Sequence, residues 1–154
     1  MLKKVSLLSF FVLLIAACNS NPSGFTIDGE LEGELENGTK VYLKTVDSLA
    51  RGLVDIDTTT IENGVFTFMG VSGAPKVHYL FFEGIQGSSP LILENGKISF
   101  KAQKDSLAFS RVKGTPQNNS FMEFLKESRR LNAMSKSMTD EFRAATLSKD
   151  TANI

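Results

Sequence analysis

Apolar and polar residues alternate along several short segments between residues 25 and 113. Phe25 and Ile27 alternate with Thr26 and Asp28, which is the pattern of a strand with one buried face. Further strand candidates lie at 41–43, 53–61, 65–68, 76–82, 90–93, 97–100 and 107–112. About seven to eight short strands separated by turns predict a mainly β domain over residues 24–114, an antiparallel β-sandwich or open barrel.

The tripeptide Glu-Asn-Gly occurs three times, at 36–38, 62–64 and 94–96. Asn-Gly favours a tight hairpin, because both residues tolerate the positive φ of a type I′ turn. The segments after residues 64 and 96 carry apolar residues at matching offsets. We therefore expect a β-hairpin at each tripeptide.

The residues after Gly114 predict one long C-terminal α-helix within 115–147, followed by a tail at 148–154. Ser120 and Glu123 have the spacing of a capping box, and neither proline nor glycine follows before Thr146. Phe124, Leu131 and Met138 repeat every seven residues and form a narrow apolar seam. We expect the distal half of this helix to lack a partner within the chain.

The first 17 residues are typical of a bacterial export signal. Lys3 and Lys4 precede an uncharged apolar run that ends at Ala17, and this run is too short to span a bilayer permanently. The residues Ile15, Ala16, Ala17 and Cys18 resemble a lipobox. The resemblance implies a signal peptide at 1–17, acylation of Cys18 and a lipidated tether at 18–23. The alternative is an ordinary signal peptide with an incidental cysteine.

Charge and cysteine content narrow the possible functions. Without residues 1–17, 15 basic and 17 acidic side chains remain, a net charge of −2. This balance gives no electrostatic footprint for nucleic acid, so we expect no nucleic-acid partner. Cys18 is the only cysteine, so the chain has no Cys-x-x-Cys pair for dithiol redox chemistry.

The candidates for catalysis are weak. Asp55 and Asp57 are two apart on a predicted strand and would share one face; a solvated strand face explains them better than an acid–base pair. His78 is the only histidine, so a zinc site of recognised spacing is excluded, and a structural role is the better interpretation. We expect no catalytic, cofactor or metal site and no enzymatic activity; a hydrolase using His78 is the least favoured hypothesis.

Several short motifs carry a family resemblance when taken in order. They are Phe25-x-Ile27-x-Gly29, Val41-Tyr42-Leu43, Asp57-Thr58, Asn63-Gly64-Val65-Phe66-Thr67-Phe68-x-Gly70, Glu94-Asn95-Gly96-Lys97-Ile98 and Gly114-Thr115-Pro116-Gln117-Asn118. Behind a lipobox, this order resembles the domain of unknown function 4369 of Gram-negative lipoproteins, over about residues 24–118. The family module has no assigned active-site residues.

The resemblance also implies a function. In the family, the β-module usually precedes a thioredoxin-like domain of the peroxiredoxin or thiol-disulfide oxidoreductase type, and the long helix connects the two. We expect the redox half to be missing here, through a truncated or split reading frame. The chain would be a non-catalytic module on the periplasmic face of the outer membrane. Its partners would be membrane lipid, through Cys18, and a thioredoxin-like domain or helix along Phe124, Leu131 and Met138.

A second hypothesis differs in class. A stand-alone lipoprotein could bind a peptide or a glycan at a sheet edge or at its loops. An exposed apolar or aromatic patch away from the helix would favour it.

Overall fold

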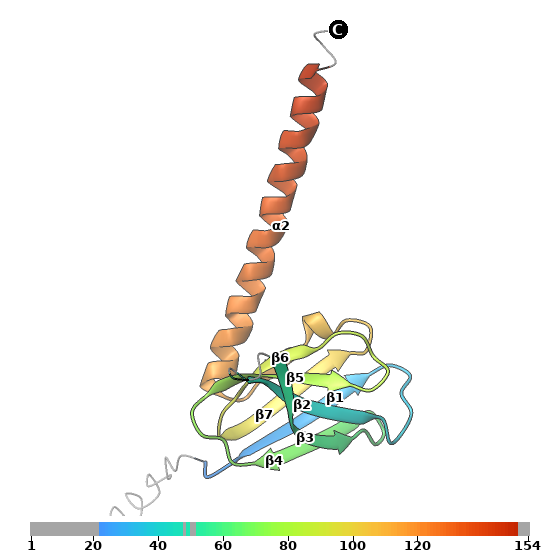
Figure 1. Cartoon of the computed structure of the whole chain (residues 1–154), viewed down its shortest axis with the longest axis vertical. Helices are drawn as coiled ribbons and strands as arrows, with labels where there is room; N and C mark the ends of the chain where they lie inside the picture. The colour runs from blue at the N-terminus through green and yellow to red at the C-terminus, as the bar shows by residue number, and fades with distance from the viewer. Residues whose placement is uncertain (1–21, 48, 50–51, 151–154) are drawn as a thin grey trace, which may run out of the picture.

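A computed structural model describes residues 22–47, 49 and 52–150 of the chain. Eight strands form two four-stranded sheets, and one long helix follows them (Figure 1). The elements are β1 (Phe25–Glu32), β2 (Lys40–Asp47), β3 (Gly52–Thr60), β4 (Val65–Gly70), β5 (Lys76–Phe82), β6 (Ser89–Leu93), β7 (Gly96–Gln103), the 3-10 helix η2 (Leu107–Phe109), β8 (Arg111–Lys113) and α2 (Pro116–Asp150). The predicted fold class, mainly β with a long C-terminal helix, is confirmed.

The two sheets have the strand orders β4-β1-β7-β8 and β3-β2-β5-β6. Among the described strands the pairing is antiparallel, as expected, except between β1 and β7, which run parallel from Phe25 beside Gly96 to Glu32 beside Gln103. A parallel pair needs a long crossover, and here the crossover contains the whole second sheet. Alternation within one strand carries no information about such a distant pairing.

The core lies between the two sheets and is built from alternate residues of every described strand except β3, which Ile61 follows directly. Phe66 on β4 packs edge-on against Phe82 on β5, with ring centroids 5.6 Å apart, and so joins the two sheets. Such aromatic pairs add to the stability that apolar burial provides. The buried apolar residues form one cluster: Phe25, Ile27, Leu31, Val41, Leu43, Ile61, Phe66, Phe68, Leu80, Phe82, Leu91, Leu93, Ile98, Phe100, Ala102, Leu107 and Val112.

The three Glu-Asn-Gly tripeptides do not form the expected hairpins. Each lies where the chain passes from one sheet to the other: after β1, after β3 and after β6. Only Asn63 has a positive φ among the described non-glycine residues, 53°, and it is followed by Gly64 at 80°. Glu62 and Val65 close this tight turn through two backbone hydrogen bonds, yet β3 and β4 then enter different sheets. Asn-Gly fixes the local turn, and more distant packing decides which strands pair.

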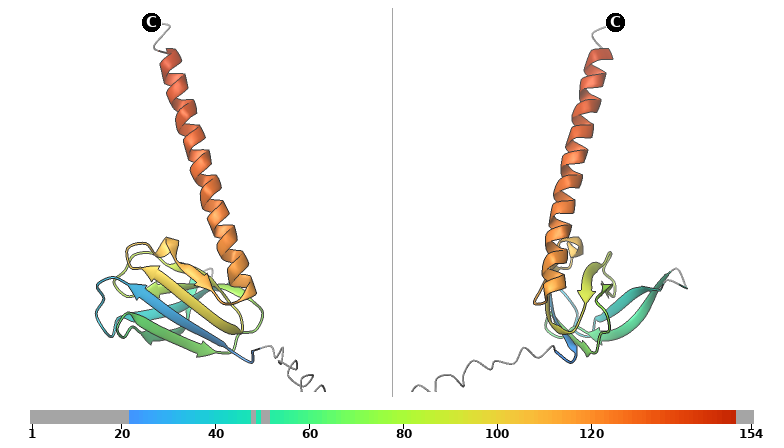
Figure 2. Two further views of the ribbon diagram at one scale, coloured as in Figure 1. Left: turned by 180° about the vertical axis from the view of Figure 1, so that it is seen from behind. Right: turned by 90° about the vertical axis from the view of Figure 1, so that its left-hand side faces the viewer.

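The helix leaves the β domain after its first turns. Figure 2 shows α2 standing away from both sheets, while β2 and β3 reach out as a ribbon on another side. Every residue from 129 to 147 is exposed to solvent. The distal half of the helix is therefore solvent-exposed over these residues.

Candidate interaction site on the C-terminal helix

The base of α2 is fixed to the sandwich by a buried asparagine. The Nδ2 group of Asn118 donates to the carbonyl oxygen of Ile92 at 2.7 Å, and its Oδ1 accepts from the Ile92 backbone N–H at 2.9 Å. Asn118 is fully buried, so these bonds are shielded from water and hold the helix against β6. The side chain takes the place of a neighbouring strand at this point of the sheet edge.

The helix begins at Pro116, four residues earlier than the capping-box prediction at Ser120. Proline suits the first helical position because its missing N–H would be unsatisfied there anyway. Thr115 Oγ1 accepts a hydrogen bond from Asn118 Nδ2 at 2.8 Å, and Glu94 Oε1 accepts from the Gln117 backbone N–H at 3.0 Å. A carboxylate at a helix N-terminus also interacts favourably with the helix dipole. The start is therefore set by a contact with the loop before β7, and the Ser120 prediction is wrong.

The predicted seam lies on the surface of α2. Phe124, Leu131 and Met138 are exposed by 64%, 58% and 67%. Met134 and Phe142 lie at helical spacing from them, on the same face, and are also exposed. We call these five side chains the helix stripe. Sequence reasoning singled out three of them; the four-residue spacing on either side of Met138 was the signal for Met134 and Phe142.

The helix stripe extends about 27 Å along α2, since its first and last residues are 18 positions apart. Polar side chains beside it bond within the helix itself. Arg130 pairs with Glu127 at 2.9 Å, and Ser137 donates to Glu141 at 3.0 Å. These four polar side chains are thus paired within the helix, whereas the stripe leaves apolar surface in water. Large exposed apolar patches on a soluble domain mark interaction sites.

The proposed carboxylate pair does not share a face. A bulge in the pairing of β2 with β3 places Asp57 opposite Leu43 and Asp55 opposite Lys44, so that Ile56 is the extra residue. Neighbouring residues of a strand point to opposite faces, and the two aspartates therefore point apart. Asp55 pairs with Lys44 at 2.9 Å. The prediction of a shared face, which rested on the two-residue spacing, is wrong because the bulge adds one residue.

His78 is a buried strand residue. Its side chain is 7% exposed, and Nδ1 lies 3.0 Å from the carbonyl oxygen of Lys76. Burial lowers the pKa of the imidazole, because the charged form loses its hydration. Among the residues that the structure describes, no hydrogen bond joins His78 to a carboxylate or to a hydroxyl group. This is the environment expected of a structural histidine.

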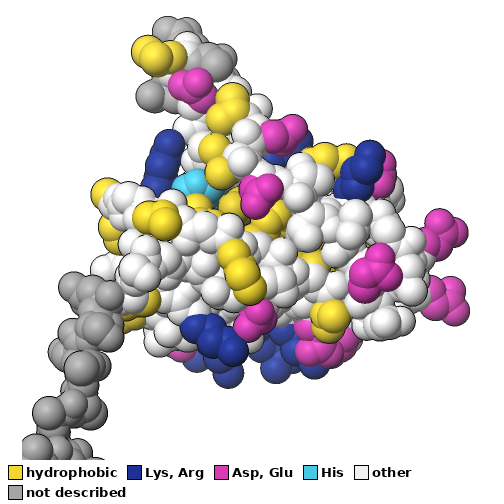
Figure 3. Space-filling view, turned by 90° about the horizontal axis from the view of Figure 1, so that it is seen from below, with side chains coloured by type: hydrophobic (Ala, Val, Ile, Leu, Met, Phe, Trp, Pro, Cys, Tyr) yellow, Lys and Arg dark blue, Asp and Glu magenta, His cyan; other side chains and the backbone are white. Residues whose placement is uncertain are grey.

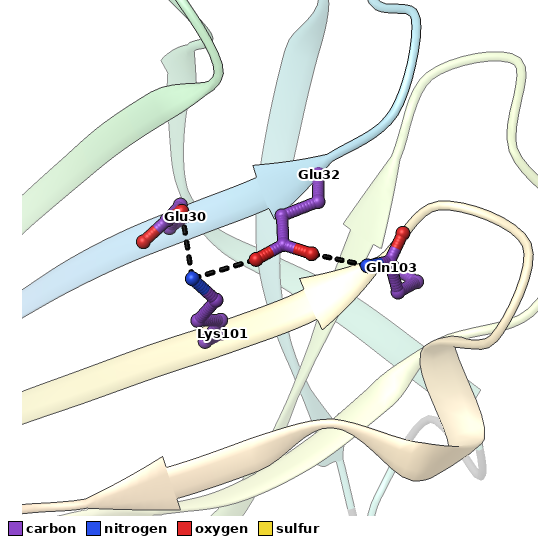
Figure 4. A network of polar contacts seen from close by, with 4 residues as sticks. All are labelled: Glu30, Glu32, Lys101 and Gln103. Atoms are coloured by element: carbon purple, nitrogen blue, oxygen red, sulfur yellow. Dashed lines mark hydrogen bonds and ion pairs between the residues drawn. The ribbon is translucent and has the colours of Figure 1, made fainter.

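A network of ion pairs covers the outer face of the parallel β1–β7 pair. Lys101 lies 2.9 Å from Glu30 and 2.6 Å from Glu32, and Gln103 donates to the same Glu32 (Figure 4). The hydrogen bond that Lys101 donates lowers the pKa of Glu32, and donation to both glutamates raises the pKa of Lys101. The groups are solvent-accessible, and Lys101 pairs with both carboxylates, so they form a structural contact across the two strands.

Within residues 22–47, 49 and 52–150, no three His, Cys, Asp or Glu side chains gather as a metal site, and no helix is long and apolar enough to cross a membrane. On the face opposite the helix, hydrophobic side chains form separate small patches among polar surface (Figure 3). The predicted lipobox residues Ile15, Ala16, Ala17 and Cys18 lie outside the residues that the structure describes.

The fold is a β-sandwich followed by a projecting helix that carries an exposed apolar face. A family model for a domain of unknown function, DUF4369, matches residues 25–121, which span the sandwich and the first turn of α2. The chain therefore belongs to the DUF4369 family, and the resemblance found in the sequence is confirmed. No curated protein and no solved structure matches the chain.

Proposed function

We propose that this chain is a non-catalytic, lipid-anchored module that positions a thiol-disulfide oxidoreductase domain in the bacterial cell envelope. The observation that carries the proposal is the helix stripe, five apolar side chains that the module's own fold leaves in water. Because Cys18 is the only cysteine in the printed sequence, the reactive thiols of the proposed system would be those of the thioredoxin-like domain. The thioredoxin-like nature of that partner follows from the family resemblance.

The start of the fold and the start of the helix lie together. A Cβ atom added to Gly96 would lie 2.9 Å from Thr115 Cγ2 and 3.7 Å from Pro22 Cγ. Pro22 is four residues from Cys18, a reach of at most about 14 Å. An acylated Cys18 would therefore hold the base of α2 close to the membrane surface.

The 35 residues of α2 give a rod of about 52 Å. If its base is held at the membrane, the helix determines the distance and the direction of a bound domain from the membrane surface. We place the module at the outer membrane, on its periplasmic face. The β-sandwich holds the base of the helix in place through the hydrogen bonds of Asn118 and Glu94.

The anchor is tested by labelling cells that express the full chain with radioactive palmitate. The chain should carry label and sediment with membranes, and Cys18→Ser should lose the label and leave the membranes or stay unprocessed. A control, Cys18→Ser with Ser20→Cys, keeps one thiol outside the lipobox and should also stay unlabelled. An unlabelled wild-type chain would contradict the anchor.

The positioning role is tested by photo-crosslinking in the native cell. A photoreactive residue at Met138 should capture a protein with a thioredoxin-like Cys-x-x-Cys domain, identified by mass spectrometry. Lys136 is the matched control position, because two residues turn the helix by about 200° and so face away from the helix stripe. Capture of only unrelated proteins at Met138, or equal capture at both positions, would overturn the proposal.

A further inference from the structure

One more exposed aromatic side chain, Phe109, lies on the sandwich and outside the helix stripe. Phe109 is 67% exposed, although its neighbours Leu107 and Ser110 are buried at 4% and 7%. Ser89 Oγ donates to the carbonyl oxygen of Leu107 at 2.7 Å, and the Phe109 N–H donates to Ser106 at 2.9 Å. These two hydrogen bonds fix the 3-10 turn η2, which holds the Phe109 ring in solvent.

The ring is also held from the side by the helix. The Arg129 guanidinium carbon lies 5.5 Å from the Phe109 ring centroid, and Arg129 Nη1 donates to the carbonyl oxygen of Ala108 at 3.2 Å. A cation over an aromatic face is attracted to it. Phenylalanine and arginine are both enriched at protein interfaces relative to the rest of the surface.

Phe109 forms one end of a groove of about 500 Å³ between β8 and the first turns of α2. The groove carries four cationic side chains and one acidic side chain, Glu123. Lys126 lies 3.6 Å from this Glu123. Neither Arg111 nor Lys113 has a carboxylate within ion-pair distance among the residues described. The groove is lined by Phe109, Ser110, Arg111, Val112, Lys113, Asn119, Met122, Glu123, Lys126 and Arg129. Its positive charge contrasts with the net charge of −2 expected for the mature chain.

The floor and one wall of the groove suit an extended segment. Val112 is buried, and Met122 packs against the core cluster, so the floor is apolar and fixed. β8 is the last strand of its sheet, and among the described strands it pairs with β7 alone. Binding of an extended peptide alongside an edge strand is common in proteins.

We propose that this groove binds an acidic peptide segment in extended conformation, with one apolar side chain packed on Phe109 and carboxylates facing Arg111, Lys113 and Lys126. Charge selects the ligand class: three of the four cations surround the floor, and the fourth, Arg129, orients the aromatic ring. The peptide site is separate from the helix stripe. Its failure would therefore leave the positioning role untouched, and the reverse also holds.

The test uses the full chain in a non-ionic detergent and a fluorescein-labelled peptide, Glu-Leu-Glu-Leu-Glu with blocked ends, followed by fluorescence anisotropy. We expect saturable binding that weakens as salt rises, because the contacts are ionic. Lys113→Glu and Lys126→Glu should each weaken binding at least fivefold. Lys136→Glu makes the same charge change on the exposed part of α2 and should leave binding unchanged.

The aromatic contact has its own pair of variants. Phe109→Ala should weaken binding at least tenfold, whereas Met69→Ala, at a residue of similar exposure (71%) on β4, should have no effect. Both side chains are on the surface, so the fold should survive either change. The same peptide with Gln in place of Glu should bind at least tenfold more weakly.

Three results would overturn the proposal. The first is no binding at 1 mM peptide, and the second is equal binding by the groove variants and their controls. The third is groove-dependent sedimentation with anionic phosphatidylglycerol vesicles without any peptide binding, which would assign the cations to a lipid surface instead.

Discussion

The β-sandwich and the helix α2 use their apolar residues in opposite ways. In the sandwich, 17 apolar side chains from both sheets form one buried cluster. In the helix, all residues from 129 to 147 are exposed, including Leu131, Met138 and Phe142. Burial stabilises the sandwich, while the distal helix relies on local pairs worth only a few tenths of a kcal/mol each. Apolar side chains that do not stabilise the fold are available to bind a partner.

The largest effect is the expected difference in stability between two leucine-to-alanine variants, one in each region. Leu43 on β2 is fully buried and Leu131 on α2 is 58% exposed. We expect Leu43→Ala to lower the free energy of unfolding by about 2–5 kcal/mol, because it leaves a cavity. Leu131→Ala should change it by less than about 0.5 kcal/mol. Urea denaturation followed by circular dichroism in the β-sheet region measures both.

A large loss of stability in Leu131→Ala would mean that the stripe is already covered in solution, for instance by another copy of the chain. Repeating the denaturation at several protein concentrations detects this case, because the stability of an associated form depends on concentration. If both variants lost the same free energy of unfolding at every protein concentration, the proposed difference between a buried sandwich leucine and an exposed helix leucine would be wrong.

A smaller loss of stability is expected when a glycine that lies against a core ring is replaced by alanine. A Cβ atom at Gly29 on β1 would lie 2.1 Å from the ring of Phe66. The ring is buried among other aromatic side chains and has no room to shift. Gly29→Ala should therefore cost about 1–3 kcal/mol through overpacking, measured in the same urea experiment. Gly73→Ala is the control, since nothing lies within 4 Å of its added Cβ, and a neutral Gly29→Ala would contradict the packing.

The turn at Asn63 tests the corner between the two sheets. Its φ of 53° is unfavourable for a β-branched residue. Asn63→Val should destabilise the sandwich by about 1 kcal/mol or more, seen as a lower melting temperature. Asn63→Gly tolerates the same φ and should lose less. Equal melting temperatures for Asn63→Val and the wild type would contradict the positive φ at this corner.

These positions also show how far the sequence predicts the fold. Alternation at Phe25 and Ile27 predicted a strand because burial of one face is a local property. Asn63-Gly64 predicted a tight turn for the same reason. Neither pattern could tell that β3 and β4 join different sheets, because pairing depends on contacts between segments far apart in the sequence. The parallel neighbour of β1 is β7, which begins about 70 residues later.

Of the two candidate surfaces, the sequence likewise predicted the one that depends on local spacing and missed the one that depends on the fold. The seven-residue repeat of Phe124, Leu131 and Met138 identified one helix face from sequence alone. The helix start was missed because Asn118 and Glu94 act through contacts that no local pattern shows. The groove beside Phe109 was missed too, since it joins η2, β8 and α2 only in the folded chain.

The smallest effect is a change in the pKa of Glu32, which should follow the loss of an ion pair between strands but not the loss of one within the helix. Lys101 bonds to Glu30 and Glu32, about 70 residues away, and lowers the pKa of Glu32. A carboxylate with a lowered pKa stabilises the fold above its ordinary pKa, and this contribution is lost as pH falls through the folded value.

We expect Lys101→Gln to raise the pKa of Glu32 toward its ordinary value in a carbon-13 NMR titration. Lys97→Gln, which removes the neighbouring pair with Asp28 at 3.2 Å, should leave that pKa nearly unchanged. Adding 1 M salt to the wild type should act in the same direction as Lys101→Gln, because these groups are exposed and ions screen them. Removing Arg130, whose partner Glu127 is three residues away on the helix, should not move Glu32 at all. If Lys101→Gln left the pKa of Glu32 in place, the cross-strand network would have no role on this face of the sandwich.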